Sequence, residues 1–129
     1  SGGGAPPGVL VGPEAAAVAP PPVELPAKET ARLCLRAAQE FEATGKTQEA
    51  VRLYEKARTS DPTLTKQAAR RLAVLYDKAG EFSRSAGEYE TLLADSPNDA
   101  DLLNDLGYSH YCRGDWGGAE ATLARAVAA

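Results

Sequence analysis

Apolar residues recur along most of the chain at the spacing expected for the buried face of a helix. Leu33, Ala37 and Phe41 stand at positions i, i+4 and i+8, which share one face of an α-helix. Gly45 then acts as a stop signal, because glycine readily adopts the left-handed conformation that ends many helices. The next segment has an inward-facing stripe of its own, so the two segments predict an antiparallel helix hairpin. That second stripe comprises Ala50, Tyr54 and Ala57.

The same pattern occurs three times. Gly45, Gly80 and Gly114 are 35 and 34 residues apart. Equivalent positions around them hold small residues, which let helices approach closely, or aromatic residues, which fill the space between hairpins. A repeat of this length predicts stacked helix hairpins, an architecture that usually binds proteins and rarely does chemistry. The small positions are Ala38, Ala73, Gly107, Ala50, Ser85 and Ala119, the aromatic ones are Phe41, Tyr76, Tyr54 and Tyr89, and His110 takes the remaining aromatic position of the first helices.

Capping signals predict where the helices begin. Asp61-Pro62 and Ser96-Pro97 each join a capping side chain to a proline at the first helical position, where the missing N–H costs nothing. Asp115 provides a cap for the last helix. We therefore expect six helices, over residues 29–44, 47–59, 62–79, 82–95, 97–112 and 115–128.

The three units resemble tetratricopeptide repeats (TPRs), and the resemblance over about residues 29–129 is specific because all three units match in register. It implies an all-α fold, a right-handed α-solenoid of three antiparallel helix hairpins. The repeats would span about 31–64, 66–99 and 100–129 within a domain of residues 28–129. The first helices of such an array line a concave groove that commonly holds a peptide or helix of a partner protein. The resemblance thus implies a protein–protein interaction module or scaffold.

The groove positions of the family fall on the first helix of each hairpin. Asn104, Tyr108 and Tyr111 stand at i, i+4 and i+7 and share one helix face. Tyrosine is enriched where proteins bind partners; the alternative is that these tyrosines pack on the next repeat or on the N-terminal tail. The resemblance assigns twelve residues to the partner-binding groove: Arg32, Leu35, Gln39, Glu42, Arg70, Val74, Asp77, Lys78, Asp101, Asn104, Tyr108 and Tyr111.

One TPR subfamily clamps the acidic C-terminal tails of chaperones with Lys, Asn and Arg at set groove positions. This chain departs from that pattern, with Leu35 in place of the first Lys, Gln39 in place of the first Asn and Arg71 in place of the second. Asp101 and Asp105 replace the final basic pair, and two carboxylates repel a carboxylate ligand. The chain is therefore not expected to be of the carboxylate-clamp type.

The overall charge is acidic. Lys and Arg total 14 against 18 Asp and Glu, a net charge of −4, which argues against nucleic acid as the main partner because phosphate neutralisation needs a basic surface. Residues 98–129 hold five acids against two bases. An acidic, aromatic end of the groove suits a ligand with Lys or Arg; the alternative is an ordinary solvated surface.

Residues 1–27 differ from the rest, since 18 of them are Pro, Gly or Ala. Such a segment buries too little apolar surface to offset the entropy lost on ordering, so we expect an extended tail or linker, with polyproline II structure at Pro20-Pro21-Pro22. An alternative is that part of residues 9–27 docks on a helical surface of its own or a neighbouring copy.

The two cysteines, Cys34 and Cys112, fall in the first and third hairpins. Stacking should hold them further apart than the 7 Å or so between Cα atoms that a disulfide allows, so we predict none and favour a reducing compartment such as the cytoplasm. No apolar run approaches the ~20 residues of a membrane span, so no membrane insertion is expected in this segment. A link from the tail to a membrane anchor of a longer protein stays an open alternative.

The sequence does not bring together the side chains that catalysis or metal binding needs. His110 and Cys112 are two positions apart on one helix and point in different directions, which prevents a nucleophile–base contact. One histidine and two distant cysteines do not supply a zinc site, and His110 is expected to pack in the core. Gly117-Gly118 lacks the Lys and Ser/Thr of a phosphate loop. We therefore predict a protein that is not an enzyme and has no metal or cofactor.

A second functional hypothesis is self-association. TPR arrays usually follow their last hairpin with a polar-faced capping helix, and none follows the third unit in this sequence. Leu123, Ala126 and Val127 should then be partly exposed and could stack on a second copy, with the N-terminal tail docked on a neighbouring copy as a further possibility. The sequence could equally be a piece of a longer array.

Overall fold

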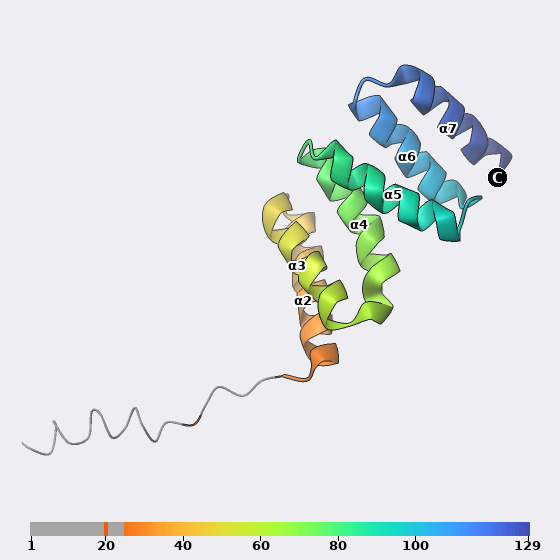
Figure 1. Cartoon of the computed structure of the whole chain (residues 1–129). Helices are drawn as coiled ribbons and strands as arrows, with labels where there is room; N and C mark the ends of the chain where they lie inside the picture. Colours follow the sequence, from red (N-terminus) through yellow and green to blue (C-terminus); the bar gives the residue numbers. More distant parts are fainter. Residues whose placement is uncertain (1–19, 21–24) are drawn as a thin grey trace, which may run out of the picture.

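In a computed structural model, the chain is described at Pro20 and over residues 25–129. Six α-helices pack one after another as three antiparallel hairpins, and no strand occurs in these residues (Figure 1). The predicted all-helical solenoid is confirmed. The hairpins are α2 (Ala27–Ala43) with α3 (Thr47–Ser60), α4 (Thr65–Lys78) with α5 (Phe82–Asp95), and α6 (Ala100–Cys112) with α7 (Trp116–Ala128).

Each hairpin turns at a glycine in the left-handed region. Gly45, Gly80 and Gly114 have φ values of 78°, 76° and 76°, and no other described residue has a positive φ. Each glycine is followed by a residue whose N–H bonds back into the last turn of the first helix; Lys46 N, for example, donates to the carbonyl of Phe41 at 2.8 Å. The prediction that these glycines end the first helices is therefore confirmed.

The start of the second hairpin is close to the prediction. The carboxylate of Asp61 accepts a hydrogen bond of 3.0 Å from Thr63 N and caps a short 3₁₀ helix, η2 (Pro62–Leu64). The α-helix proper then begins at Thr65. At the last hairpin, Asp115 accepts 2.9 Å from Gly118 N, so its predicted capping role is confirmed.

The predicted start of α6 is wrong by one turn. We expected Ser96-Pro97 to begin the helix, but α6 begins at Ala100. Asp99 is the cap, since its carboxylate accepts a hydrogen bond of 3.1 Å from Leu102 N. Arg70 of α4 also binds the Asp99 carboxylate, and this contact from another helix helps to fix the start at Asp99.

The core lies between the helices and between successive hairpins. The small positions allow the close approach predicted for them, because Ala38, Ala50, Ala73 and Ser85 have no exposed surface. Complete burial of a large side chain such as Leu72 contributes roughly 1.5–3 kcal/mol. Two buried clusters result, one between the first two hairpins around Tyr54, Leu72, Leu75 and Tyr76, and one between the last two around Ala69, Ala73, Tyr89, Leu92 and Leu102.

Ion pairs join successive hairpins along their length. Arg58 of α3 binds Glu88 of α5 through two parallel hydrogen bonds of 2.9 Å, and both side chains are largely buried. This two-pronged geometry is the stronger kind of ion pair. Lys66 and Asp95 pair at the surface within the second hairpin, where such a contact contributes less than about 1 kcal/mol.

Several predictions concern the N-terminal tail. Residues 1–19 and 21–24, which carry the polyproline and docking hypotheses, lie outside the described residues. None of the helices described is both long enough and apolar enough to cross a membrane. Cys34 is buried, Cys112 is exposed, and both are free thiols.

Candidate functional site

Two cavities open along the face formed by the first helices of the hairpins. The larger has a volume of about 650 Å³ and lies between α4 and α6, with Tyr89 and Leu123 as further lining residues; we name it the C-terminal cavity. The smaller, the N-terminal cavity, has a volume of about 570 Å³ and lies between α2 and α4. Lys78 and Asp105 line both, so the two cavities are successive parts of one inner groove.

Nine of the twelve residues predicted to face the groove line these cavities. Arg32, Leu35 and Asp101 line neither; Leu35 packs against the buried cluster of the first two hairpins. The C-terminal cavity holds Val74, Asp77, Lys78, Asn104, Tyr108 and Tyr111. The N-terminal cavity holds Gln39, Glu42 and Arg70, together with Lys78.

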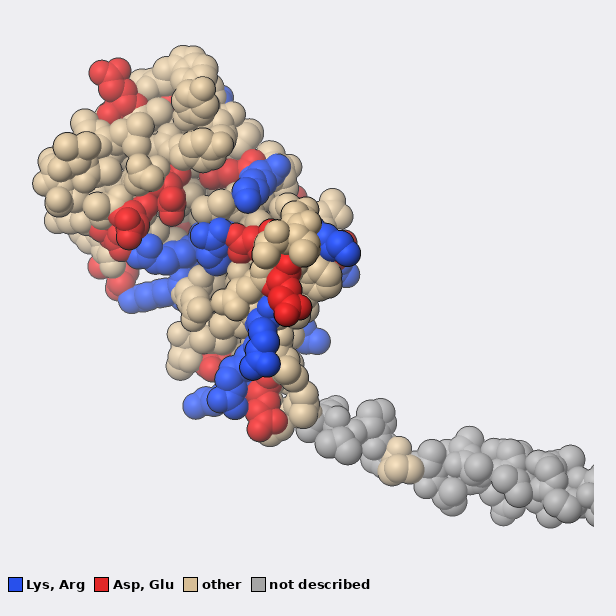
Figure 2. Space-filling model, turned by 180° about the vertical axis from the view of Figure 1, so that it is seen from behind, with Lys and Arg blue, Asp and Glu red and all other residues tan. Residues whose placement is uncertain are grey.

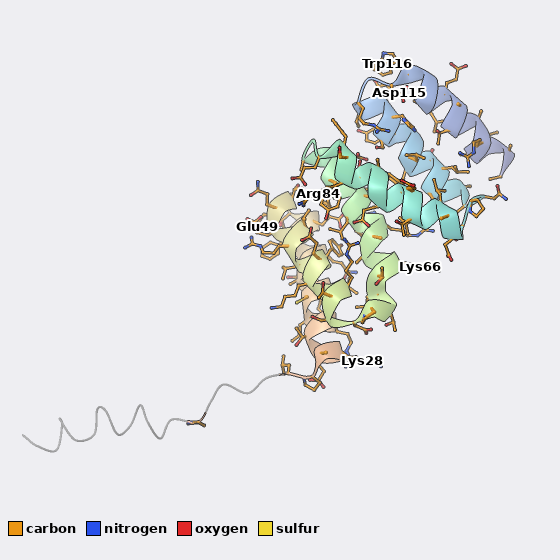
Figure 3. All side chains as sticks on the ribbon, viewed as in Figure 1. Lys28, Glu49, Lys66, Arg84, Asp115 and Trp116 are labelled. Atoms are coloured by element: carbon orange, nitrogen blue, oxygen red, sulfur yellow. The ribbon has the colours of Figure 1, made fainter. Side chains whose placement is uncertain are left out.

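Three exposed aromatic side chains adjoin the turn from α6 to α7. Tyr108 and Tyr111 are 64% and 56% exposed, and their rings stack with centroids 6.2 Å apart and planes 17° from parallel. Trp116, labelled beside Asp115 in Figure 3, packs edge-on against Tyr111 at 4.9 Å. Both tyrosines remain exposed to solvent beside the third hairpin. Exposed aromatic rings in a group form the kind of surface on which partner side chains pack.

The N-terminal cavity contains a closed polar network. Tyr54 donates a hydrogen bond of 2.7 Å to Glu42 Oε1, and Arg71 binds the same carboxylate through Nε at 3.0 Å and through Nη2. Burial tends to raise the pKa of Glu42, but the hydrogen bonds from Arg71 and Tyr54 outweigh it and lower that pKa. Glu42, predicted as a partner contact, is thus already engaged within the chain.

The polar groups of the C-terminal cavity are not joined in one hydrogen-bonded network like the one in the N-terminal cavity. Asp77 accepts a hydrogen bond of 2.9 Å from the hydroxyl of Ser109. The hydroxyl of Tyr89 is buried and has no hydrogen-bond partner among the described residues. Burial and the nearby charges of Asp77 and Asp105 raise the pKa of Tyr89, so the phenol stays protonated. Burial also raises the pKa of Asp105.

His110 is half-buried in the corner where α6 meets α7, rather than deep in the core as predicted. Its Nδ1 lies 3.0 Å from Asp115 Oδ2 and 2.8 Å from Arg113 Nη2. This small cluster holds the turn together. Within residues 25–129 and at Pro20, no three His, Cys, Asp or Glu side chains are grouped so as to hold a metal ion.

Charge is unevenly spread over the surface. Figure 2 shows basic and acidic side chains close together over the first two hairpins, whereas the third hairpin presents a mostly uncharged surface. Acidic Asp77 and Asp105 line the C-terminal cavity, and Lys78 is the basic side chain that lines it. The groove therefore changes from a balanced set of charges at its first hairpin to a mostly uncharged, aromatic surface at its third, with the two carboxylates in the cavity between the second and third hairpins.

Other lining residues are not among the twelve that the resemblance assigned to the partner-binding groove. Tyr89 and Leu123 come from second helices, whereas the family resemblance assigns only first-helix positions to the groove. Asp105 stands nine residues before Gly114, as Arg71 stands nine before Gly80, so the repeat register itself marks it as a groove position. The remaining unpredicted lining residues are Gly107 and Cys112 in the C-terminal cavity and Ala43, Tyr54, Gln67 and Arg71 in the N-terminal cavity.

Comparison with known proteins agrees with this architecture. The family model of the tetratricopeptide repeat matches residues 70–129, which run from the middle of α4 through the third hairpin. No curated protein sequence matches the chain.

Proposed function

Because this chain is a tetratricopeptide repeat protein, we propose that it binds a peptide or helical segment of a partner protein along the inner groove, chiefly at the C-terminal cavity. TPR arrays are typically non-catalytic interaction or scaffold modules, and stacked helix repeats generate extended concave surfaces suited to that role. Membership of the family therefore implies a protein partner. That the partner binds in the groove, at the residues named above, is our proposal.

The observation that carries the proposal is the pair of exposed, stacked rings of Tyr108 and Tyr111 that line the C-terminal cavity. Both tyrosines line the C-terminal cavity together with the apolar side chains of Val74 and Leu123. Binding energy at interfaces concentrates in aromatic side chains next to pockets that exclude water. The volume of about 650 Å³ lies in the range of natural ligand pockets and accommodates a few side chains of a peptide.

Selection from a random peptide library tests this proposal. The immobilised domain should enrich a set of related peptides, and the double variant Tyr108→Ala/Tyr111→Ala should bind them at least about tenfold more weakly, because each ring removed from an interface centre typically costs 1 kcal/mol or more. A matched control is Leu33→Ala/Val127→Ala, which removes two exposed apolar side chains that line neither cavity. Equal binding to the tyrosine variant and the parent domain would contradict the assignment of the groove.

A second candidate function is self-association through α7. The apolar side chains of Leu123 and Val127 are 39% and 88% exposed on that helix, and exposed apolar side chains on a repeat helix favour stacking on another unit. Light scattering over a range of concentrations tests it. Association through α7 predicts a mass that rises with concentration and falls back to that of the monomer in Val127→Glu, whereas a constant monomer mass in the parent protein argues against it.

A further inference from the structure

The same three positions in the repeat connect the first hairpin to the second and the second to the third, and we call each set of three residues a joint. The two joints differ in the sign of the charge at one of these positions. In register with the turn glycines, each joint has one acid three residues before its glycine and one tyrosine nine residues after it. The third residue stands nine positions before the next glycine, and it is basic in one joint and acidic in the other. The first joint comprises Glu42, Tyr54 and Arg71, and the second joint comprises Asp77, Tyr89 and Asp105.

The first joint is complete within the chain. Arg71 binds the carboxylate of Glu42, and Tyr54 donates its hydroxyl hydrogen to the same carboxylate at 2.7 Å. The carboxylate of Glu42 thus accepts hydrogen bonds from a planar guanidinium and from a phenol at the same time. The three groups balance one another in both charge and hydrogen bonding.

The second joint lacks that cation. Asp105 occupies the position of Arg71, is half-buried, and pairs with no cation among the described residues. Asp77 has a side chain one methylene shorter than Glu42, and it accepts its hydrogen bond from Ser109 rather than from the tyrosine. Tyr89 is only 2% exposed, and its hydroxyl has no partner within the described part of the chain. A buried hydroxyl without a partner is rare in folded proteins.

All three groups of the second joint line the C-terminal cavity. Lys78 also lines that cavity, but it is exposed, and its charge acts on Glu42 of the first joint. The charges of Arg71 and Arg70 reach Asp105, as do those of the acids Asp101 and Asp99. Neither arginine forms an ion pair with Asp105, because Arg71 pairs with Glu42 and Arg70 with Asp99. The lining of the cavity therefore includes two carboxylates, the exposed ring of Tyr108 and a hydroxyl that has no partner among the described residues.

We propose that the second joint binds an arginine side chain of the partner, whose guanidinium occupies the place that Arg71 occupies in the first joint. The guanidinium donates hydrogen bonds to the carboxylates of Asp77 and Asp105, and the hydroxyl of Tyr89 gains a polar neighbour. Arginine fits better than lysine because its planar fork reaches two acceptors at once, and its flat face packs against an aromatic ring. This inference rests on the proposed function and names the chemistry of the ligand that the groove takes.

A short alanine peptide with one central arginine and blocked ends is the direct probe. Matched peptides carry citrulline, which keeps the shape of arginine but removes its charge, or lysine. In ¹H–¹⁵N NMR titrations, the arginine peptide should shift the amide resonances of Asp77, Asp105 and Tyr108, with an affinity about tenfold or more above that of citrulline and a smaller advantage over lysine. Equal affinity for arginine and citrulline would overturn the inference.

Two variants of Asp105 sharpen the test. Asp105→Asn preserves the size of the side chain and should weaken the binding of the arginine peptide about tenfold. The control Glu120→Gln, which neutralises an exposed acid of the third hairpin outside both cavities, should leave that binding unchanged. Asp105→Arg supplies a guanidinium from within the chain and should abolish binding of the peptide while the domain stays folded. Unchanged binding to Asp105→Asn overturns the inference even if Asp105→Arg fails to fold.

The two proposals fail in different ways. If peptides selected from the library depend on Tyr108 and Tyr111 but not on Asp105, the groove assignment stands and the arginine site is wrong. If the selected peptides depend on neither tyrosine, the groove assignment itself is wrong. Dependence on Tyr108, Tyr111 and Asp105 together, with arginine enriched in the selected sequences, supports both.

Discussion

A Cβ atom added to Gly107 would lie 2.6 Å from Cδ2 and 2.7 Å from Cγ of Leu123, so α6 and α7 meet so closely that any larger residue would displace the Leu123 side chain. The third hairpin is thereby drawn together more tightly than a side chain at position 107 would allow. The same approach brings Leu123 of α7 to the edge of the C-terminal cavity. The glycine thus shapes both the hairpin and the site.

Gly107→Ala should destabilise the domain although alanine favours a helix. The overpacked contact with Leu123 costs about 1–3 kcal/mol and exceeds the gain in helix propensity, which is at most about 1 kcal/mol. The matched control is Gly87→Ala in α5, where an added Cβ meets nothing within 4 Å; this change should stabilise by about 0.5–1 kcal/mol. Urea unfolding of the two variants should show opposite signs.

Tyr54→Phe and Tyr89→Phe should differ although the two tyrosines occupy equivalent positions. Tyr54→Phe loses the hydrogen bond to Glu42 and should cost about 0.5–1.5 kcal/mol. Tyr89→Phe removes a buried hydroxyl without a partner and should be neutral or stabilising, because the desolvation cost of that group is relieved. The free energies of unfolding in water measure both effects. An equal loss in the two variants would contradict the finding that the Tyr89 hydroxyl has no hydrogen-bond partner among the described residues.

Glu42→Gln should show a pH-dependent loss of stability. The pKa of Glu42 is lowered in the folded protein, so its contribution is present above the unfolded value, near 4.5, and disappears as the pH falls through the lower folded value. The variant should therefore be less stable than the parent at pH 7. The difference should shrink below about pH 4.5 when unfolding is followed in urea at each pH.

Asp105→Asn should have the opposite sign. Burial raises the pKa of Asp105 above its ordinary value of 3.8, so the ionised carboxylate weakens the folded state at neutral pH. The variant should be more stable than the parent at pH 7, and this advantage should vanish as the pH falls through the raised folded value towards 3.8. A variant less stable than the parent at pH 7 would show that Asp105 is paired in solution.

Tyr108→Ala/Tyr111→Ala should separate binding from stability. Both side chains are exposed, so their removal should change the free energy of unfolding by less than about 1 kcal/mol. Circular dichroism and urea unfolding measure this directly. A large loss of stability would indicate that the two tyrosines stabilise the third hairpin rather than serve to bind a partner.

The three hairpins could be predicted from the turn glycines, because a backbone position that requires a positive φ strongly favours glycine. The start of α6 could not, since Ser96 and Asp99 are both good caps. The choice between them involves Arg70, which binds Asp99 from another helix. Only a tertiary contact distinguishes the two positions, and local sequence does not contain it.

The groove was predictable only in part for the same reason. The repeat register identifies which residues stand on the inner face, and most of them line the two cavities. It does not say which are already engaged: Glu42 and Arg70 are paired within the chain, whereas Tyr108 and Tyr111 stay exposed. Trp116 completes the aromatic group from the first position of α7, where the repeat pattern has no fixed aromatic residue.

The ion pairs across the joints also determine how the domain would respond to force. Most contacts lie within a hairpin, and the remaining ones join neighbouring hairpins. Tension applied to the two ends therefore passes through the joints in series, and the weaker joint opens first. The second joint, without an internal cation, is the one expected to give way. A bound guanidinium would raise the force needed to open that joint. The extension of the domain at a given force would then depend on whether a partner is bound.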